Sequence, residues 1–144
     1  MEIHQVTDNF SVSPQIATTD LDELQSQGFR LVVNNRPDGE APDQPEGFSI
    51  ATAARAAGLD YVAIPVSSAG FQMPQVDEMA QALARSGGKT LAFCRSGTRS
   101  IMLWALAEAQ RGGEPETIAE QVASAGYNAA PIRPTMVAIA AARS

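Results

Sequence analysis

The fold is decided by residues 90–100, which read TLAFCRSGTRS. The apolar run from Thr90 to Phe93 predicts a short buried strand, and residues 100–110 are typical of a helix. Cys94 therefore follows the carboxyl end of a strand and comes just before a helix. Because open α/β sheets place their ligand crevices at this position, the sequence predicts a functional site here.

The residues after Cys94 favour the binding of an anion. Gly97 allows a tight turn that directs successive backbone amides inward, and the following helix adds its positive end. The Arg99 guanidinium can hold two oxygens of a tetrahedral anion. We therefore predict an anion-binding set made of Arg95, Ser96, Gly97, Thr98 and Arg99.

The same loop predicts a nucleophile. The inward amides and the helix end would stabilise a thiolate, so we expect Cys94, Arg99 and Ser100 to be catalytic. Ser100 could hydrogen-bond the sulfur, either to keep it ionised or to protonate it as a leaving group. Arg95 either joins the cradle or points away to a surface ion pair. A buried cysteine often only packs, but the neighbouring Gly97 and Arg99 argue against that alternative.

The rest of the chain alternates strands with helices. A single α/β domain over residues 1–144, with a parallel sheet flanked by helices, is therefore expected. Strands are predicted at 29–34 and 61–66, a loop at 36–47, and helices at about 18–27, 49–57, 74–85, 115–125 and 134–143. The expected core side chains are Met73, Met79, Leu103, Trp104 and Leu106, whereas His4 is expected to be exposed and without function.

Composition excludes several classes of protein. With 1 cysteine and 1 histidine in 144 residues, neither a disulfide, a Cys/His zinc site nor a Cys–His pair is expected, and no cofactor or metal is predicted. The net charge of -6 argues against nucleic-acid and membrane-surface binding. The sequence has no apolar run long enough to cross a bilayer, so a reducing cytoplasm is the expected location. The sequence makes no prediction of the oligomeric state.

Four stretches resemble a known family. They are residues 10–15 (FSVSPQ), 33–40 (VNNRPDGE), 64–66 (IPV) and 93–100 (FCRSGTRS). Together they resemble the phosphatase-like domain of beta-lactamase hydrolase-like proteins, a bacterial branch of the cysteine-phosphatase fold. The resemblance implies a dual-specificity-phosphatase-like fold, Cys94 as nucleophile with a phosphocysteine intermediate, Arg99 as anion clamp, and a small oxyanion or phosphorylated substrate.

The cysteine loop departs from the phosphatase pattern. Such phosphatases place five residues between cysteine and arginine, whereas only residues 95–98 separate Cys94 from Arg99. The shorter spacing resembles rhodanese-like sulfurtransferases, which implies a Cys94 persulfide, a sulfur donor and a thiol acceptor as an alternative. A second alternative is a non-catalytic domain that holds an anionic ligand.

The resemblance also implies a general acid, for which the chain lacks the usual residue. The loop at 67–72 reads SSAGFQ and carries no carboxylate. Asp77 and Glu78 in the next helix, and Asp38 and Glu40 in the 36–47 loop, are possible substitutes, although helix caps and turns also explain them. Arg36 would add positive charge if that loop folds over the site.

Overall fold

The sheet is mixed but mostly parallel. The computed structural model describes residues 1–143 and contains a five-stranded sheet in the order β1-β2-β5-β3-β4. β2, β5, β3 and β4 run parallel, and β1 pairs antiparallel with β2. The strands are β1 (His4–Thr7), β2 (Phe10–Ser13), β3 (Phe29–Asn34), β4 (Asp60–Ala63) and β5 (Lys89–Phe93). The predicted α/β class, with a parallel sheet flanked by helices, is confirmed.

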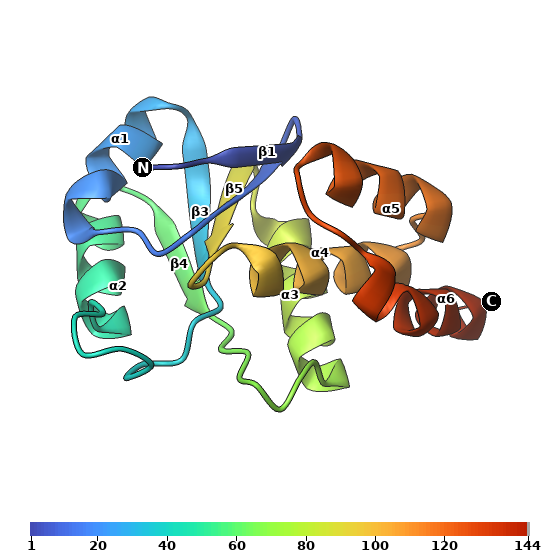
Figure 1. The fold of residues 1–144 in the computed structure, drawn as a ribbon. Helices are drawn as coiled ribbons and strands as arrows, with labels where there is room; N and C mark the ends of the chain where they lie inside the picture. The colour runs from blue at the N-terminus through green and yellow to red at the C-terminus, as the bar shows by residue number, and fades with distance from the viewer. Residues whose placement is uncertain (144) are drawn as a thin grey trace.

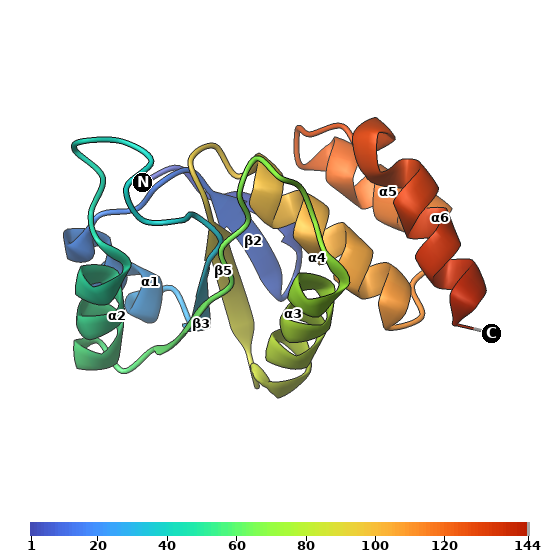
Figure 2. The ribbon, with the colours of Figure 1, turned by 90° about the horizontal axis from the view of Figure 1, so that it is seen from below.

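Helices cover both faces of this sheet. α1 and α2 lie on one face, α3 and α4 lie on the other, and α5 and α6 pack outside α4 (Figures 1 and 2). All the predicted helices are present, displaced by at most a few residues at their ends. Their bounds are α1 (Leu21–Ser26), α2 (Gly47–Ala56), α3 (Met73–Arg85), α4 (Thr98–Gln110), α5 (Pro115–Ser124) and α6 (Arg133–Ala142), with short 3₁₀ turns at Thr18–Asp20 and Ala130–Ile132. Within residues 1–143, no helix combines the length and the apolar character that crossing a membrane requires.

The sequence did not predict the N-terminal hairpin of β1 and β2. Each strand is only four residues long, and β2 carries Ser11 and Ser13, whose side chains are buried although they are polar. The pairing of β2 with β5 explains this, because it makes β2 an interior strand. His4 is half-buried within β1, so the prediction of a freely exposed terminal residue was wrong.

The strand predicted at 61–66 ends earlier, at Ala63. Pro65 has no N–H to donate, so the regular ladder stops before it. The chain nevertheless stays beside β3, because the amides of Ile64 and Val66 donate to the carbonyls of Asn34 and Asn35, both at 2.9 Å. This course carries the loop after β4 along the carboxyl edge of the sheet.

A large apolar core fills the space between the sheet and α3 to α6, and a smaller one lies under α1 and α2. Trp104 stacks on Phe10 with ring centroids 5.3 Å apart. Trp104 is buried as predicted, together with Leu103, Leu106 and Met79. Met73 is 48% exposed, so its expected place in the core was wrong. It opens the first turn of α3, before the helix reaches its first buried residue, Val76.

The two methionines of α3 form a matched pair for a stability test. Replacing the fully buried Met79 by alanine removes core contacts and leaves a cavity, so we expect Met79→Ala to lower the free energy of unfolding by about 2–5 kcal/mol. Met73→Ala should change it by about 0.5 kcal/mol or less. Urea denaturation of both variants measures the difference, and equal losses would contradict this description of α3.

Candidate active site

The cysteine loop closes around the sulfur of Cys94. Cys94 is fully buried directly after β5, and its own amide donates to the Ser13 carbonyl of β2 at 3.4 Å. The loop then turns back, so that the Gly97 amide donates to Cys94 Sγ at 3.1 Å. Gly97 has a φ of +91°, in the left-handed region that favours glycine, and immediately precedes α4. The amino end of α4 therefore points toward the sulfur, where its dipole stabilises negative charge.

Arg99 is fixed by two other loops. Its Nη1 and Nη2 donate to the two carboxylate oxygens of Glu40, at 2.8 and 2.9 Å, and Nη1 also donates to the Val66 carbonyl at 2.7 Å. Glu40 follows β3 and Val66 follows β4. One guanidinium thus joins three segments at the carboxyl edge of the sheet.

These bonds leave one edge of the Arg99 guanidinium available. A guanidinium has five N–H bonds, and Glu40 and Val66 use both of those on Nη1 and one on Nη2. The remaining N–H bonds, on Nε and Nη2, lie side by side and match two oxygens of a tetrahedral anion. The hydrogen bond to Glu40 is the main cause of the raised pKa of Arg99, and the charge of Cys94 and a side-chain hydrogen bond with it raise this pKa further, so the sulfur interacts directly with the guanidinium.

The carboxylate of Glu40 is shared between two arginines. Arg36 is buried, and its Nε donates to Glu40 Oε1 at 2.9 Å, while its Nη1 donates to Gln15 Oε1 at 3.0 Å. The hydrogen bond from Arg99, with further stabilisation from Arg36, outweighs burial and lowers the pKa of Glu40 to about 2. The bond to Glu40 is likewise the main cause of the raised pKa of Arg99. The 36–47 loop therefore does reach the site, and Arg36 acts through Glu40.

A pocket of about 390 Å³ opens at this point. Its lining residues are Glu40, Ser68, Arg95 and Arg99. Arg95 belongs to the pocket wall, and no surface ion pair involves it in the part of the chain that the structure describes. Ser68 comes from the loop at 67–72, where the sequence lacks a carboxylate. The pocket is thus positively charged on the side of the cysteine loop.

The remaining predicted site residues have other contacts. Ser100 is fully buried, but its Oγ has no hydrogen-bond partner among residues 1–143, so its expected bond to the sulfur is absent. The side chains of Ser96 and Thr98 bond to each other at 3.1 Å. Of the anion-binding set, only Gly97 and Arg99 therefore show contacts that direct donors into the cradle.

Two of the predicted acid candidates, Asp38 and Asp77, bond to residues outside the cysteine loop. Asp77 accepts a hydrogen bond from Gln110 at 2.6 Å, at the end of α4 that lies farthest from the cysteine loop. Asp38 accepts the amide of Gly47 at 2.8 Å, where α2 begins. Their expected accessory roles are corrected to structural ones, because each carboxylate fixes a turn or joins two helices.

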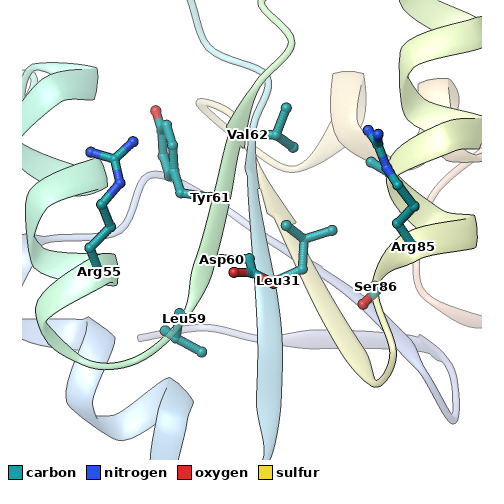
Figure 3. Close-up of a pocket in the computed structure, with 9 residues that line it drawn as sticks. Leu31, Arg55, Leu59, Asp60, Tyr61, Val62, Arg85 and Ser86 are labelled. Carbon is teal, nitrogen blue, oxygen red and sulfur yellow. The ribbon is translucent and has the colours of Figure 1, made fainter.

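A second pocket, of about 450 Å³, lies at the other end of the sheet. Figure 3 shows Arg55 and Arg85 on either side of the strands, with Asp60 at the start of β4. These residues mark the amino ends of the parallel strands, opposite the cysteine loop. In α/β sheets ligands bind at the carboxyl ends, which favours the Arg99 pocket as the site. Among residues 1–143, no group of three His, Cys, Asp or Glu side chains could hold a metal ion.

The sheet and its helices define an α/β domain with the cysteine-phosphatase fold. Residues 2–111 match the family described as beta-lactamase hydrolase-like protein, phosphatase-like domain, and the chain belongs to that family. The predicted resemblance is thereby confirmed. A beta-lactamase hydrolase-like protein of Agrobacterium fabrum is 36% identical over 112 residues, which is 78% of this chain and 26% of that protein. The chain thus spans about a quarter of the length of this relative.

Solved structures show the same architecture. A candidate phosphatase from Neisseria meningitidis superposes with a TM-score of 0.82 at 27% identity, covering 96% of this chain and 99% of that one. A kinase associated phosphatase, solved with serine in place of its catalytic-site cysteine, gives a TM-score of 0.70 at 15% identity, with coverage of 93% and 86%. The second likeness concerns the fold alone, and both agree with the predicted dual-specificity-phosphatase-like fold.

The sequence did not reveal the structural role of Glu40. The sequence predicts Glu40 as a substitute acid or a turn residue, whereas in the structure its carboxylate orients Arg99. Nothing in the spacing could have indicated this, because the two residues are 59 positions apart. Only the meeting of the loops after β3 and β5 brings them together.

The Glu40 contacts predict a specific pH dependence of stability. Since the folded pKa of Glu40 is about 2, below its ordinary value of 4.5, the ion pairs stabilise the fold above pH 4.5, and this stabilisation is lost as the pH falls toward 2. Because Glu40 is exposed and solvent screens its ion pairs, we expect Glu40→Gln to lower the free energy of unfolding by only about 0.5–1 kcal/mol at neutral pH. The difference from the wild type should shrink below about pH 4.5. Urea denaturation across this range is the measurement, with the exposed Glu78→Gln as control.

The available edge of Arg99 predicts how the site binds oxyanions. Lysine keeps the charge but lacks the paired donors, so Arg99→Lys should weaken phosphate binding about tenfold or more in calorimetric titration. Arg85→Lys, in the pocket at the other end of the sheet, should leave the affinity unchanged. An unaltered affinity in Arg99→Lys would mean that the anion binds elsewhere.

Proposed function

We propose that this domain is a cysteine-dependent phosphatase whose nucleophile is Cys94. The observation that carries the proposal is the arrangement around the sulfur. The Gly97 amide donates to Sγ at 3.1 Å, and Arg99, which also interacts with Cys94, has two adjacent N–H bonds that neither Glu40 nor Val66 uses. Membership of a phosphatase-like family supports the same reaction. The substrate class is a phosphorylated compound or small oxyanion that fits the pocket beside Arg95 and Ser68.

The reaction has two steps. In the first, the Cys94 thiolate attacks phosphorus, an S–P bond forms, and the P–O bond breaks with its electron pair leaving on oxygen. In the second, water attacks the phosphocysteine and returns the thiolate. Arg99 and the loop amides stabilise the equatorial oxygens in both steps, because they are already oriented before charge develops. Cys94 is fully buried and does not line the pocket, so the cysteine loop must move for a substrate in the pocket to reach the sulfur.

The leaving oxygen has no carboxylic acid beside it. Glu40 is the carboxylate in the pocket wall, and with a pKa of about 2 it holds no proton at neutral pH. Asp38 and Asp77 bond to Gly47 and Gln110 instead. Ser68 stands on the loop where such phosphatases carry their acid, and a hydroxyl is a much weaker proton donor. The substrate must therefore carry a good leaving group.

The absence of a carboxylic acid beside the leaving oxygen predicts that the hydrolysis rate depends strongly on the leaving group. Activated aryl phosphates should turn over slowly, and alkyl phosphates about a hundredfold to ten-thousandfold more slowly, because only the latter need protonation. Cys94→Ser should abolish both activities, whereas Asp77→Asn should leave the rates unchanged. Steady-state kinetics with both ester types is the measurement. Equal rates for aryl and alkyl esters would mean that an acid acts in this site.

The length of the loop favours sulfur transfer as a second candidate. Four residues separate Cys94 from Arg99, as in rhodanese-like sulfurtransferases. In that reaction Cys94 attacks the sulfane sulfur of thiosulfate, sulfite leaves as a stable anion, and the persulfide passes its sulfur to a thiol. No general acid is required, which suits this pocket.

One pair of assays distinguishes the candidates. Incubation with thiosulfate should add one sulfur to the intact mass of the wild type and none to Cys94→Ser if sulfur transfer occurs. A persulfide that turns over with a thiol acceptor, together with no hydrolysis of aryl phosphates, would replace the phosphatase proposal. Neither activity in folded protein that still binds phosphate would leave a non-catalytic anion-binding domain.

A further inference from the structure

One peptide group of the cysteine loop is hydrogen-bonded at both ends. Its N–H belongs to Gly97 and donates to Cys94 Sγ at 3.1 Å. Its C=O belongs to Ser96 and accepts the hydroxyl of Tyr127, also at 3.1 Å. The two groups of a trans peptide point in opposite directions, so the phenol and the sulfur lie at opposite ends of the same dipole.

Tyr127 is held in place by the segment between α5 and α6. Its amide donates to the Val122 carbonyl of α5 at 3.1 Å, after Gly126 turns the chain with a φ of +97°. Its ring meets the His4 ring of β1 edge-on, with centroids 5.8 Å apart. In Figure 2 this connection lies beside the amino end of α4. The hydroxyl is thus directed from the C-terminal helices toward the loop.

Close approach of the phenol adds a second constraint at Gly97. A Cβ at that position would collide with the Tyr127 hydroxyl, in addition to being strained at the positive φ. The side chain of Tyr127 is therefore seated directly against the turn. Any residue with a Cβ at position 97 would therefore require the phenol to move.

The phenol remains a donor at neutral pH. Burial raises the pKa of Tyr127 above its ordinary value of 10.0, and the negative charges of Cys94 and Glu2 raise it further. The hydroxyl therefore keeps its proton throughout the range in which a thiolate would react.

We propose that Tyr127 is a positioning residue for Cys94, which fixes and polarises the Ser96–Gly97 peptide so that its N–H stabilises the thiolate. Hydrogen bonds in a chain strengthen one another, so donation to the Ser96 carbonyl makes the Gly97 amide a better donor. Tyr127 lies beyond residue 111, where the match to the family ends. The inference rests on the proposed function, because it assumes that Cys94 reacts as a thiolate.

Several charged or titratable groups surround this chain of bonds and would also affect the sulfur. They are Arg95 and Arg99 on the cysteine loop and α4, Arg36 and Glu40 after β3, and His4 with Glu2 beside Tyr127. Exchanging only the Tyr127 hydroxyl leaves each of these groups in place. The test must therefore be made with Tyr127→Phe rather than with a truncation.

The experiment measures how fast iodoacetamide alkylates Cys94 as a function of pH. Because Cys94 is the sole cysteine, the intact mass reports this site alone. We expect Tyr127→Phe to slow alkylation at neutral pH about three- to tenfold and to move the pH profile upward, because the lost hydrogen bond to the Ser96 carbonyl polarises the peptide whose N–H stabilises the thiolate. The matched control is Tyr61→Phe, which removes the chain's other phenol, bonded to Asn34.

A stronger donor at the same position should act in the opposite direction. Fluorotyrosine incorporated in the Tyr61→Phe background places the label at Tyr127 alone, and its more acidic phenol should speed alkylation. Urea denaturation verifies that each variant is folded. Rates for Tyr127→Phe within twofold of the wild type, an equal loss in Tyr61→Phe, or no response to fluorine would overturn the inference.

Aryl phosphate hydrolysis measured on the same samples separates this inference from the proposed function. A wild type that does not hydrolyse phosphates, but whose alkylation depends on the Tyr127 hydroxyl, would refute the phosphatase reaction and leave the positioning role intact. An active wild type whose Tyr127→Phe variant is alkylated normally would refute only the positioning role.

Discussion

The contact on which this structure depends is the paired hydrogen bond between Arg99 and Glu40. It joins the cysteine loop to the segment after β3, and the Val66 carbonyl extends it to the segment after β4. Because these bonds occupy the end of the guanidinium, they orient its remaining edge without neutralising its ability to bind an anion. The buried Arg36 also donates a hydrogen bond to the Glu40 carboxylate and so holds it in place.

The same contact limits the chemistry of the pocket. A carboxylate that is stabilised by two arginines, with a pKa of about 2, orients Arg99 well but cannot deliver a proton. In the reactions that we propose, the site would therefore stabilise an oxyanion strongly and assist the departure of a leaving group only weakly. Phosphoryl transfer from activated esters and sulfur transfer from thiosulfate both expel a stable anion and need no general acid. The same set of residues therefore suits both candidate reactions.

The C-terminal helices take part in the same site. α5 and α6 lie outside the matched residues 2–111 and pack on α4, and their connection places Tyr127 against the turn at Gly97. The α5–α6 connection, which lies outside the family match, thereby contacts the cysteine loop at Gly97. The hairpin of β1 and β2 contributes too, through His4 against Tyr127 and the Ser13 carbonyl behind Cys94.

By itself, the sequence determined the local features. The apolar run before Cys94, the glycine in the turn and the helix after it are consequences of neighbouring residues, so the class of fold and the strand, turn and helix around Cys94 could be predicted. It did not determine β2, because a short strand with two serines shows its burial only when β5 lies beside it. Tertiary structure alone decided which carboxylate meets Arg99, that Asp38 and Asp77 bond elsewhere, and that Tyr127 reaches Ser96. Apart from the bond of Asp38 to Gly47, these contacts join residues far apart in the chain, and only the packing of parallel strands and helices sets their distances.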